Sequence, residues 1–272
     1  MAEACALASS GGDAERLGAI VRRAPLLMEA LRAARDVDAP DWLVSAGAIR
    51  DVVWDDMHRR PLSTPPRDVD LAFLDPADLS SEREHAVERA LHAHAAGLPW
   101  QASNQAAVHL WYPQRFGRKV APFTSSADAV ATFPEIATCV GVRLMADDDM
   151  LVVAPHGLDD LLGCVCRQNP TRVPASFYQQ RVADKGWITR WPHLRYVATA
   201  AAPAATSNEA GLRRTLAAPP HEHSATLHDR SPPLSSRGLG RRPLTAVTRV
   251  RIPVAVLRKR PTRRAFCRFR GA

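Results

Sequence analysis

The stretch LVSAGAIRDVVW, residues 43–54, joins a short apolar run to an amphipathic segment through Gly47. The apolar run predicts a strand that ends in a tight turn, and the segment after the turn has helical spacing of its apolar residues. A helix that begins directly after a glycine turn presents free N–H groups and partial positive charge, which suits a phosphate. Gly47, Ala48 and Arg50 are therefore candidate phosphate-binding residues.

A second stretch, PPRDVDLAFLD at residues 65–75, places Asp68 and Asp70 around a single valine and then turns apolar. Residues two apart on a strand point to the same face. Both carboxylates can then reach one hard cation, or two cations ~3.5–4 Å apart. The motif alone is more often a solvated strand edge. Following a strand, a glycine turn and a helix, it favours a metal site held by Asp68 and Asp70.

The rest of the body, residues 15–197, alternates predicted strands and helices, which indicates an α/β (α+β) domain with a mixed sheet and flanking helices. Helical spacing covers residues 17–31, and Pro25 is expected to kink or split that segment. The other predicted elements are a helix at 79–95 with Ser80 or Ser81 as N-cap and Glu84 in a capping box, a strand at 106–112, two strands within 138–155 joined by an acidic turn at 147–149, and two closing helices at 156–169 and 174–191.

The predicted strand at 106–112 carries a further candidate. Alternation puts Ala107, His109 and Trp111 on one face. His109 is able to accept a proton at neutral pH, although a structural histidine is an equally good interpretation. Asn104, just before the strand, either caps a turn or helps to bind a ligand.

Composition limits the class of protein. Hydrophobic residues make up 46% of the 272 residues, and no window approaches the ~20 consecutive apolar residues of a membrane helix. The N-terminal sequence lacks the basic start and apolar run of an export signal. Five scattered cysteines without such a signal fit a reducing compartment. We therefore expect a cytoplasmic protein without a membrane partner.

The charge is divided unevenly along the chain. Residues 198–272 hold fifteen basic and three acidic residues, a formal charge of +12, which leaves −4 for residues 1–197. This tail is rich in Arg, Pro, Ala and Ser and is expected to be largely disordered. Three interpretations stay open: an Arg-rich arm for nucleic acid, a tail without a role, or an out-of-frame continuation of a GC-rich gene. Residues 1–14 are expected to be a flexible N-terminus.

Several stretches taken together resemble a known family. LVSAGAIRDVVW followed by RDVDLAFLD is similar to the nucleotidyltransferase superfamily typified by DNA polymerase β. The other stretches narrow this to a bacterial nucleotidyltransferase-like family; they are GAIRDVVWDDMH, DVDLAFLDPADLSSERE, NQAAVHLWYPQRFG, TCVGVRL, APHGLDDLLGCVCRQNP and KGWITRWPHL. The resemblance covers about residues 25–196.

The resemblance implies a polymerase β-like fold and a metal-dependent transfer of a nucleoside monophosphate from an NTP to an unknown hydroxyl acceptor. It also implies that Asp68 and Asp70 are catalytic and bind Mg²⁺ or Mn²⁺. Members of the superfamily usually carry a third carboxylate on a later strand, and the candidate stretch PWQASNQAAVHLWY contains none. The alternative is therefore a protein of the same fold that binds a nucleotide or a partner without catalysis.

Overall fold

The structure is a computed structural model that describes residues 2–171, 173–197 and 248–252. The chain divides into two units, Met1–Thr199 with Thr245–Ala272 and Ala200–Leu244, and every described residue belongs to the first. The predictions for the Arg-rich tail lie outside the described residues, except at residues 248–252.

The described residues form helices and strands that alternate along the chain. The helices are α1 (Ala2–Arg23), α2 (Pro25–Val37), α3 (Gly47–Met57), α4 (Ser81–His94), the 3-10 helix η1 (Gln105–Ala107), α5 (Val108–Phe116), α6 (Ser126–Val130), the 3-10 helix η2 (Ile136–Thr138), α7 (Asp159–Leu162), α8 (Ala175–Lys185) and α9 (Trp187–Arg190). The strands are β1 (Leu43–Ser45), β2 (Val69–Phe73), β3 (Trp100–Asn104), β4 (Gly141–Leu144), β5 (Met150–Ala154), β6 (Val165–Arg167), β7 (Arg195–Val197) and β8 (Thr248–Ile252).

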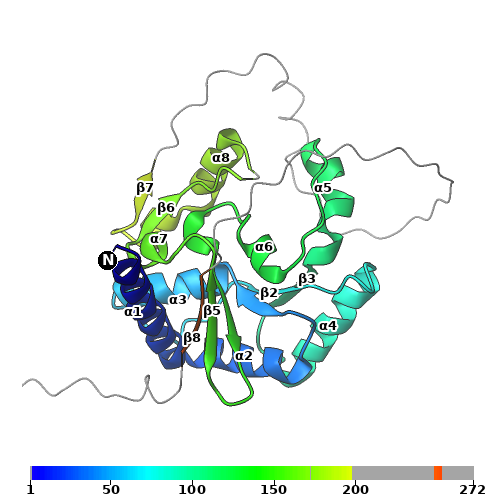
Figure 1. Cartoon of the computed structure of the whole chain (residues 1–272), viewed down its shortest axis with the longest axis horizontal. Helices are drawn as coiled ribbons and strands as arrows, with labels where there is room; N and C mark the ends of the chain where they lie inside the picture. The colour runs from blue at the N-terminus through cyan, green and yellow to red at the C-terminus, as the bar shows by residue number, and fades with distance from the viewer. Residues whose placement is uncertain (1, 172, 198–247, 253–272) are drawn as a thin grey trace, which may run out of the picture. The chain divides into compact units, whose positions relative to one another are not determined.

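One sheet organises these elements. Its strands follow the order β3-β2-β1-β4-β5-β8 (Figure 1). The β2–β3 pair is parallel and the other pairs are antiparallel. The strands β6 and β7 form a separate parallel pair. The predicted mixed sheet with flanking helices is thus confirmed. The last strand, β8, comes from the segment that we expected to be disordered.

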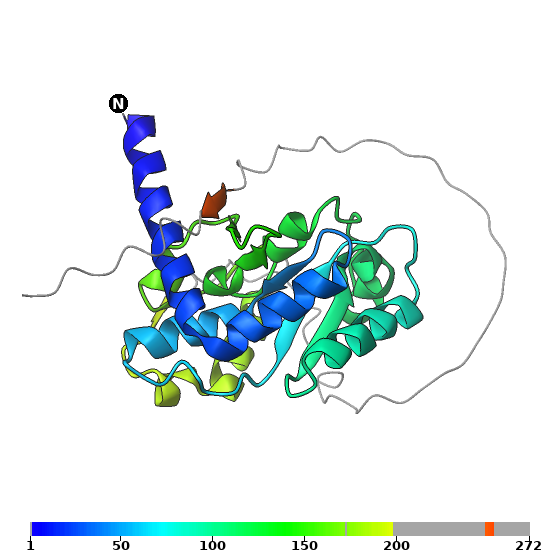
Figure 2. The same cartoon turned by 90° about the horizontal axis from the view of Figure 1, so that it is seen from below.

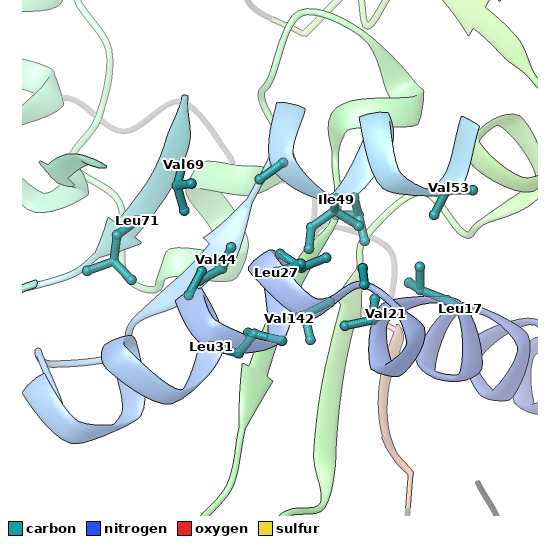
Figure 3. Packing of buried hydrophobic residues seen from close by; sticks show 14 of the residues in the cluster. Leu17, Val21, Leu27, Leu31, Val44, Ile49, Val53, Val69, Leu71 and Val142 are labelled. Carbon is teal, nitrogen blue, oxygen red and sulfur yellow. The ribbon is translucent and has the colours of Figure 1, made fainter. Parts of the chain in front are cut away.

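The main core lies between the sheet and the first two helices. Figure 3 shows apolar side chains of α1 and α2 meeting those of β1, β2, β4 and α3. The labelled residues are Leu17, Val21, Leu27, Leu31, Val44, Ile49, Val53, Val69, Leu71 and Val142. α2 and α4 contact each other and lie side by side along this face (Figure 2). Because each buried aliphatic side chain contributes about 1.5–3 kcal/mol, this layer is the main source of stability.

The opposite face of the sheet is only partly covered. A small apolar cluster joins Leu43 of β1 and Val153 of β5 to Ala127 and Val130 of α6. Strand alternation places Leu43 here while its neighbour Val44 joins the main core. Figure 1 shows α5, α6 and α8 on the side of the sheet away from α2. The area of the sheet that this cluster leaves open becomes the floor of a cavity.

Several predicted elements are confirmed. The first helical segment splits as expected, because α1 ends at Arg23 and α2 begins at Pro25, where proline suits the first helical position. The stretch at 43–54 is a strand, a turn and a helix. The acidic turn at 147–149 joins β4 to β5.

The predicted strand at 106–112 is wrong. The chain forms β3 over Trp100–Asn104 and then enters η1 and α5. The reason lies in Asn104, whose side-chain oxygen accepts hydrogen bonds from the amides of Ala106 (3.2 Å) and Asp75 (2.9 Å). This cap starts a helix, and it outweighs the strand propensity of the residues that follow.

Two smaller expectations also differ from the structure. The first closing helix is the short α7 followed by β6, and Cys164 between them has φ 50°, which ends helical geometry. Ser80 caps α4 by accepting from Arg83, but Glu84 forms no capping box, because its carboxylate accepts from the Asn104 amide at 2.6 Å. Residues 2–14 lie in α1, and their expected flexibility stays a prediction.

Candidate active site

A cavity of about 300 Å³ opens on the partly covered face of the sheet. It lies where the β1–α3 turn, β2, β3, the residues before η2 and α8 meet. Its polar lining residues are Ser45, Arg50, Asp68, Asp70, Gln101, Ser103, Gln105, Thr138, Arg181 and Lys185. The two aspartates of the D-x-D motif and the glycine turn therefore face the same space.

The register of the sheet explains which side chains reach the cavity. Asp70 of β2 pairs with Ser45 of β1 on one side and with Gln101 of β3 on the other. Residues paired across neighbouring strands project to the same face of the sheet. Gln101, Asp70 and Ser45 therefore form one row across the floor of the cavity. In this row β3 contributes the side-chain amide of Gln101 and not a third carboxylate.

Gly47 allows the turn to approach the aspartates closely. A Cβ atom built on Gly47 would lie 3.2 Å from Oδ1 of Asp68 and 3.7 Å from Nη2 of Arg50. The Gly47 amide also donates a hydrogen bond to the Asp70 carboxylate. The start of α3 and the D-x-D motif are thus in direct contact, as the order of the motifs predicts.

The aspartates carry mutually repelling charges. Burial is the largest cause that raises the pKa of Asp70, to about 6, and the charge of Asp68 raises it further. Arg50, the Gly47 amide and Arg181 oppose this rise. A divalent cation between the carboxylates would remove the repulsion.

Ser45 contributes a hydroxyl without a partner. The residue is fully buried, and its Oγ makes no hydrogen bond within the part of the chain that the structure describes. Buried polar atoms are rarely left unpaired, since each costs about 1–3 kcal/mol. The side chain lines the cavity beside Asp70. An unpartnered hydroxyl at this place indicates that a ligand group completes the site.

Arg50 is fixed by an aromatic cage and one carboxylate. Its guanidinium carbon lies 4.5 Å from the ring centroid of Trp187, 5.4 Å from that of Trp54 and 5.9 Å from that of Trp191. Nε and Nη2 donate to Oδ1 of Asp51 at 3.0 and 2.5 Å. Cation–π contacts hold such a buried guanidinium in place. Arg50 is therefore a pre-oriented cation in the wall of the cavity.

The turn itself is strained at Ala46. This residue has φ 55° and ψ −122°, a conformation that favours glycine. A non-glycine residue in such a region costs of order 1–3 kcal/mol, and strain of this kind concentrates at functional sites. The strained residue lies directly before Gly47 and lines the cavity.

Replacing Ala46 with glycine is expected to stabilise the fold by about 0.5–2 kcal/mol. The relief of strain exceeds the extra entropy that glycine gives the unfolded chain. Urea unfolding measures the change. Ala33→Gly, in the middle of α2, is the control and is expected to destabilise by at least about 1 kcal/mol. Equal destabilisation by both changes would show that Ala46 is not strained.

The structure separates three predicted site residues from the cavity. The Asn104 amide group is occupied by the backbone, donating to the carbonyls of Asp75 and Asp78 at 2.8 Å each. His109 lies on α5 with Nδ1 at 2.8 Å from the carbonyl of Ala106. The Ala48 side chain is buried in the core. None of the three is among the lining residues. Asn104 acts as a structural cap, and His109 as a base was an expectation that depended on the wrong strand.

A model of one protein family, described as nucleotidyltransferase, matches residues 32–196 of the chain. The match covers more than half of the sequence and contains the β1–α3 turn and the D-x-D motif. The chain belongs to this nucleotidyltransferase family. None of the curated proteins matches it.

A solved structure supports the same assignment. Its description states that the NMR structure of the protein reveals a CCA-adding enzyme head domain. It shares 29% sequence identity with this chain, has a TM-score of 0.57, and the alignment covers 66% of this chain and 95% of that one. The fold of this nucleotidyltransferase family member is thus similar to that of a CCA-adding enzyme head domain.

Sequence reasoning missed much of the lining of this nucleotidyltransferase cavity. Gln101 and Ser103 are the polar positions of an alternating strand, a pattern that can be recognised only when the strand is bounded at 100–104. Ser45 was visible as a polar residue inside an apolar run. Arg181 and Lys185 gave no signal, because nothing in the sequence says that α8 returns to the D-x-D motif.

The carboxylate pair of this family member fits a divalent cation. Carboxylate oxygens are the ligands that Mg²⁺ prefers, and two carboxylates are a common protein contribution. The raised pKa of Asp70 shows that its negative charge is poorly compensated, so that a bound cation would stabilise the ionised form. Among the described residues, no group of three or more His, Cys, Asp or Glu side chains is placed to hold a metal. Asp68 and Asp70 are therefore the two carboxylates that this cavity offers to such a cation.

Proposed function

We propose that this protein is a metal-dependent nucleotidyltransferase that transfers a nucleoside monophosphate from an NTP to a hydroxyl acceptor. Asp68 and Asp70 would hold Mg²⁺ or Mn²⁺. When bound, such a cation neutralises charge on the phosphate oxygens. The turn at Gly47, the start of α3 and the caged Arg50 would receive phosphate oxygens.

The proposed reaction is an in-line displacement. A hydroxyl oxygen forms a bond to the α-phosphorus, the bond from that phosphorus to the bridging oxygen of the β-phosphate breaks, and pyrophosphate leaves. We assign the hydroxyl proton to water, because no third side-chain carboxylate joins the pair in the described residues. The residues of the chain then act by holding and orienting the reactants.

One observation supports the proposal most strongly: Asp68, Asp70 and the start of α3 meet in one cavity with an unpartnered buried hydroxyl. The amide of Gly47 contacts Asp70. The Oγ of Ser45, which pairs with Asp70 across the sheet, has no hydrogen-bond partner among the described residues. This arrangement supports a ligand that brings both positive charge and hydrogen-bonding oxygens, as a metal-bound nucleotide does.

The experiment is release of pyrophosphate from each NTP with Mg²⁺, over a panel of RNA, DNA, protein and small-molecule hydroxyl acceptors. We expect release by the wild-type protein with at least one acceptor. Asp68→Asn is expected to reduce the rate by about 10³-fold or more, the order of effect seen when transition-state charge stabilisation is lost. Release that is equal in both proteins would overturn the assigned role of Asp68.

A second candidate is a protein of the same fold that binds a nucleotide but does not catalyse its transfer. The observation that favours it is the row across the sheet, where Gln101 stands beside Asp70 and supplies no carboxylate. The same assay separates the two candidates. Nucleotide binding without pyrophosphate release over the whole panel supports the binder, and release excludes it.

The expected surroundings of the protein are also proposals. None of the described helices has the length and apolar character needed to cross a membrane. Cys139, Cys164 and Cys166 are free and buried, which supports the expected cytoplasmic location. A role of the basic tail in binding nucleic acid stays a prediction, because that segment lies outside the described residues.

A further inference from the structure

The cavity has a basic wall that the sequence motifs do not include. Arg181 and Lys185 lie four residues apart on α8, and both line the cavity opposite the sheet that carries Asp70. Residues four apart project from the same side of a helix. We propose that Arg181 and Lys185 bind the β- and γ-phosphates of the nucleotide, so that the site selects nucleoside triphosphates over monophosphates.

Arg181 is held in an orientation that leaves its two terminal amino groups available to a ligand. Its Nε donates to Oε1 of Glu135 at 2.5 Å, and Glu135 is only 1% exposed. Within the described part of the chain this is the one hydrogen bond of the guanidinium, so both terminal amino groups are available for an oxyanion. A planar guanidinium binds phosphate through two parallel hydrogen bonds.

Glu135 acts as a positioning residue in this arrangement. Its second carboxylate oxygen accepts from the hydroxyl of Thr138 at 3.2 Å, and its backbone carbonyl accepts from the same hydroxyl at 2.7 Å. The carboxylate is therefore fixed before a ligand arrives. Because Glu135 engages Nε alone, it orients Arg181 without occupying the terminal amino groups.

Lys185 supplies a charge of a different kind. It is an exposed residue at the last position of α8, and no described side chain forms an ion pair with it within 4.0 Å. An ammonium group on a flexible stem suits the outer end of a polyphosphate, where charge is greatest and solvent is near. Arg181 and Lys185 thus form an inner and an outer contact along one helix.

Charge divides the cavity into two halves. Asp68 and Asp70 make the sheet side acidic, whereas the α8 side carries two cations. A metal-bound α-phosphate suits the first half, and the remaining phosphates, which carry uncompensated negative charge, suit the second. This inference rests on the proposed function for its choice of ligand but depends on different residues.

The test measures binding by isothermal titration with three probes: ATP with Mg²⁺, AMP with Mg²⁺, and inorganic tripolyphosphate in EDTA. The variants are Lys185→Ala, Arg181→Lys and Glu135→Gln, each checked for native circular dichroism. Lys119→Ala is the matched control, since Lys119 is exposed and does not line the cavity. We expect each α8 variant to lower ATP and tripolyphosphate affinity about tenfold with unchanged AMP affinity.

The probes separate this inference from the proposed function. Glu135→Gln is expected to lower the ATP-to-AMP affinity ratio, which a purely structural role would leave unchanged. Asp68→Asn is expected to strengthen binding of metal-free tripolyphosphate, because a repelling charge is removed. Tripolyphosphate binding that depends on Lys185 supports the inference even if ATP does not bind. Unchanged ATP and tripolyphosphate affinities in Lys185→Ala and Arg181→Lys would overturn it.

Discussion

Asp70→Asn is expected to make the protein more stable while it removes metal-dependent nucleotide binding. The folded state raises the pKa of Asp70 from 3.8 to about 6, chiefly by burial and then by the charge of Asp68. A rise of this size corresponds to about 3 kcal/mol. We expect a gain of about 1–3 kcal/mol in the free energy of unfolding at pH 7, because asparagine carries no charge to bury.

The pH dependence of this gain in stability identifies its cause as the ionisation of Asp70. Below about pH 3 Asp70 is largely protonated in both the folded and the unfolded states, so its ionisation costs nothing. As the pH rises from about 4 to about 6, ionisation is easier in the unfolded state, and the wild-type protein loses stability. The advantage of Asp70→Asn is therefore small at pH 4, grows up to about pH 6 and changes little above that.

Urea unfolding of both proteins at pH 4, 5, 6 and 7 measures this profile. Asp78→Asn is the control of opposite sign, because hydrogen bonds from Ser80 lower the pKa of Asp78 and stabilise its charged form. That change is expected to lower stability slightly at neutral pH. A stability gain from Asp70→Asn that is the same at all four pH values would contradict the assigned cause.

Asp55→Ala is expected to destabilise the fold by about 3–5 kcal/mol, the cost of breaking a buried ion pair. Asp55 is 3% exposed and joins α3 to the end of α9. Its Oδ1 accepts from Nε1 of Trp191 at 2.9 Å, and its Oδ2 accepts from Nη2 of Arg190 at 2.6 Å. Alanine would leave the buried indole N–H of Trp191 without its partner and would leave the Arg190 guanidinium only its longer contact with Asp51, at 3.5 Å.

Asp56→Ala is the matched control. Asp56 is the next residue of α3, but it pairs with the exposed Arg23, and such surface pairs contribute about 0–1 kcal/mol. Urea unfolding measures both variants. Asp55→Ala is also expected to weaken ATP binding, because Trp191 belongs to the cage around Arg50. Equal stability losses from the two changes would show that Asp55 does not anchor α9.

The elements that the sequence predicted correctly depend on local signals. Pro25 separates α1 from α2 because proline suits a helix start and not a helix interior. Gly47 begins α3 where the backbone approaches Asp68. Asp68 and Asp70 share the cavity because a strand repeats every two residues. In each case one or two neighbouring residues determine the outcome.

The parts that the sequence did not predict depend on distant contacts. The segment at 106–112 has strand propensity, but Asn104 is tied to the loop after β2 and starts a helix instead. Trp187 and Trp191 surround Arg50 from more than 130 positions away in the sequence. Arg181 reaches the cavity only because α8 folds over the sheet. Sequence periodicity carries no information on such pairings.

Titration of ATP into the wild-type protein and into Asp68→Asn/Asp70→Asn, each with Mg²⁺ and with EDTA, tests the central claim most directly. If the aspartates hold a cation that binds the nucleotide, Mg²⁺ raises the ATP affinity of the wild-type protein at least tenfold and leaves that of the double variant unchanged. Equal affinities and an equal response to Mg²⁺ in the two proteins would contradict the account.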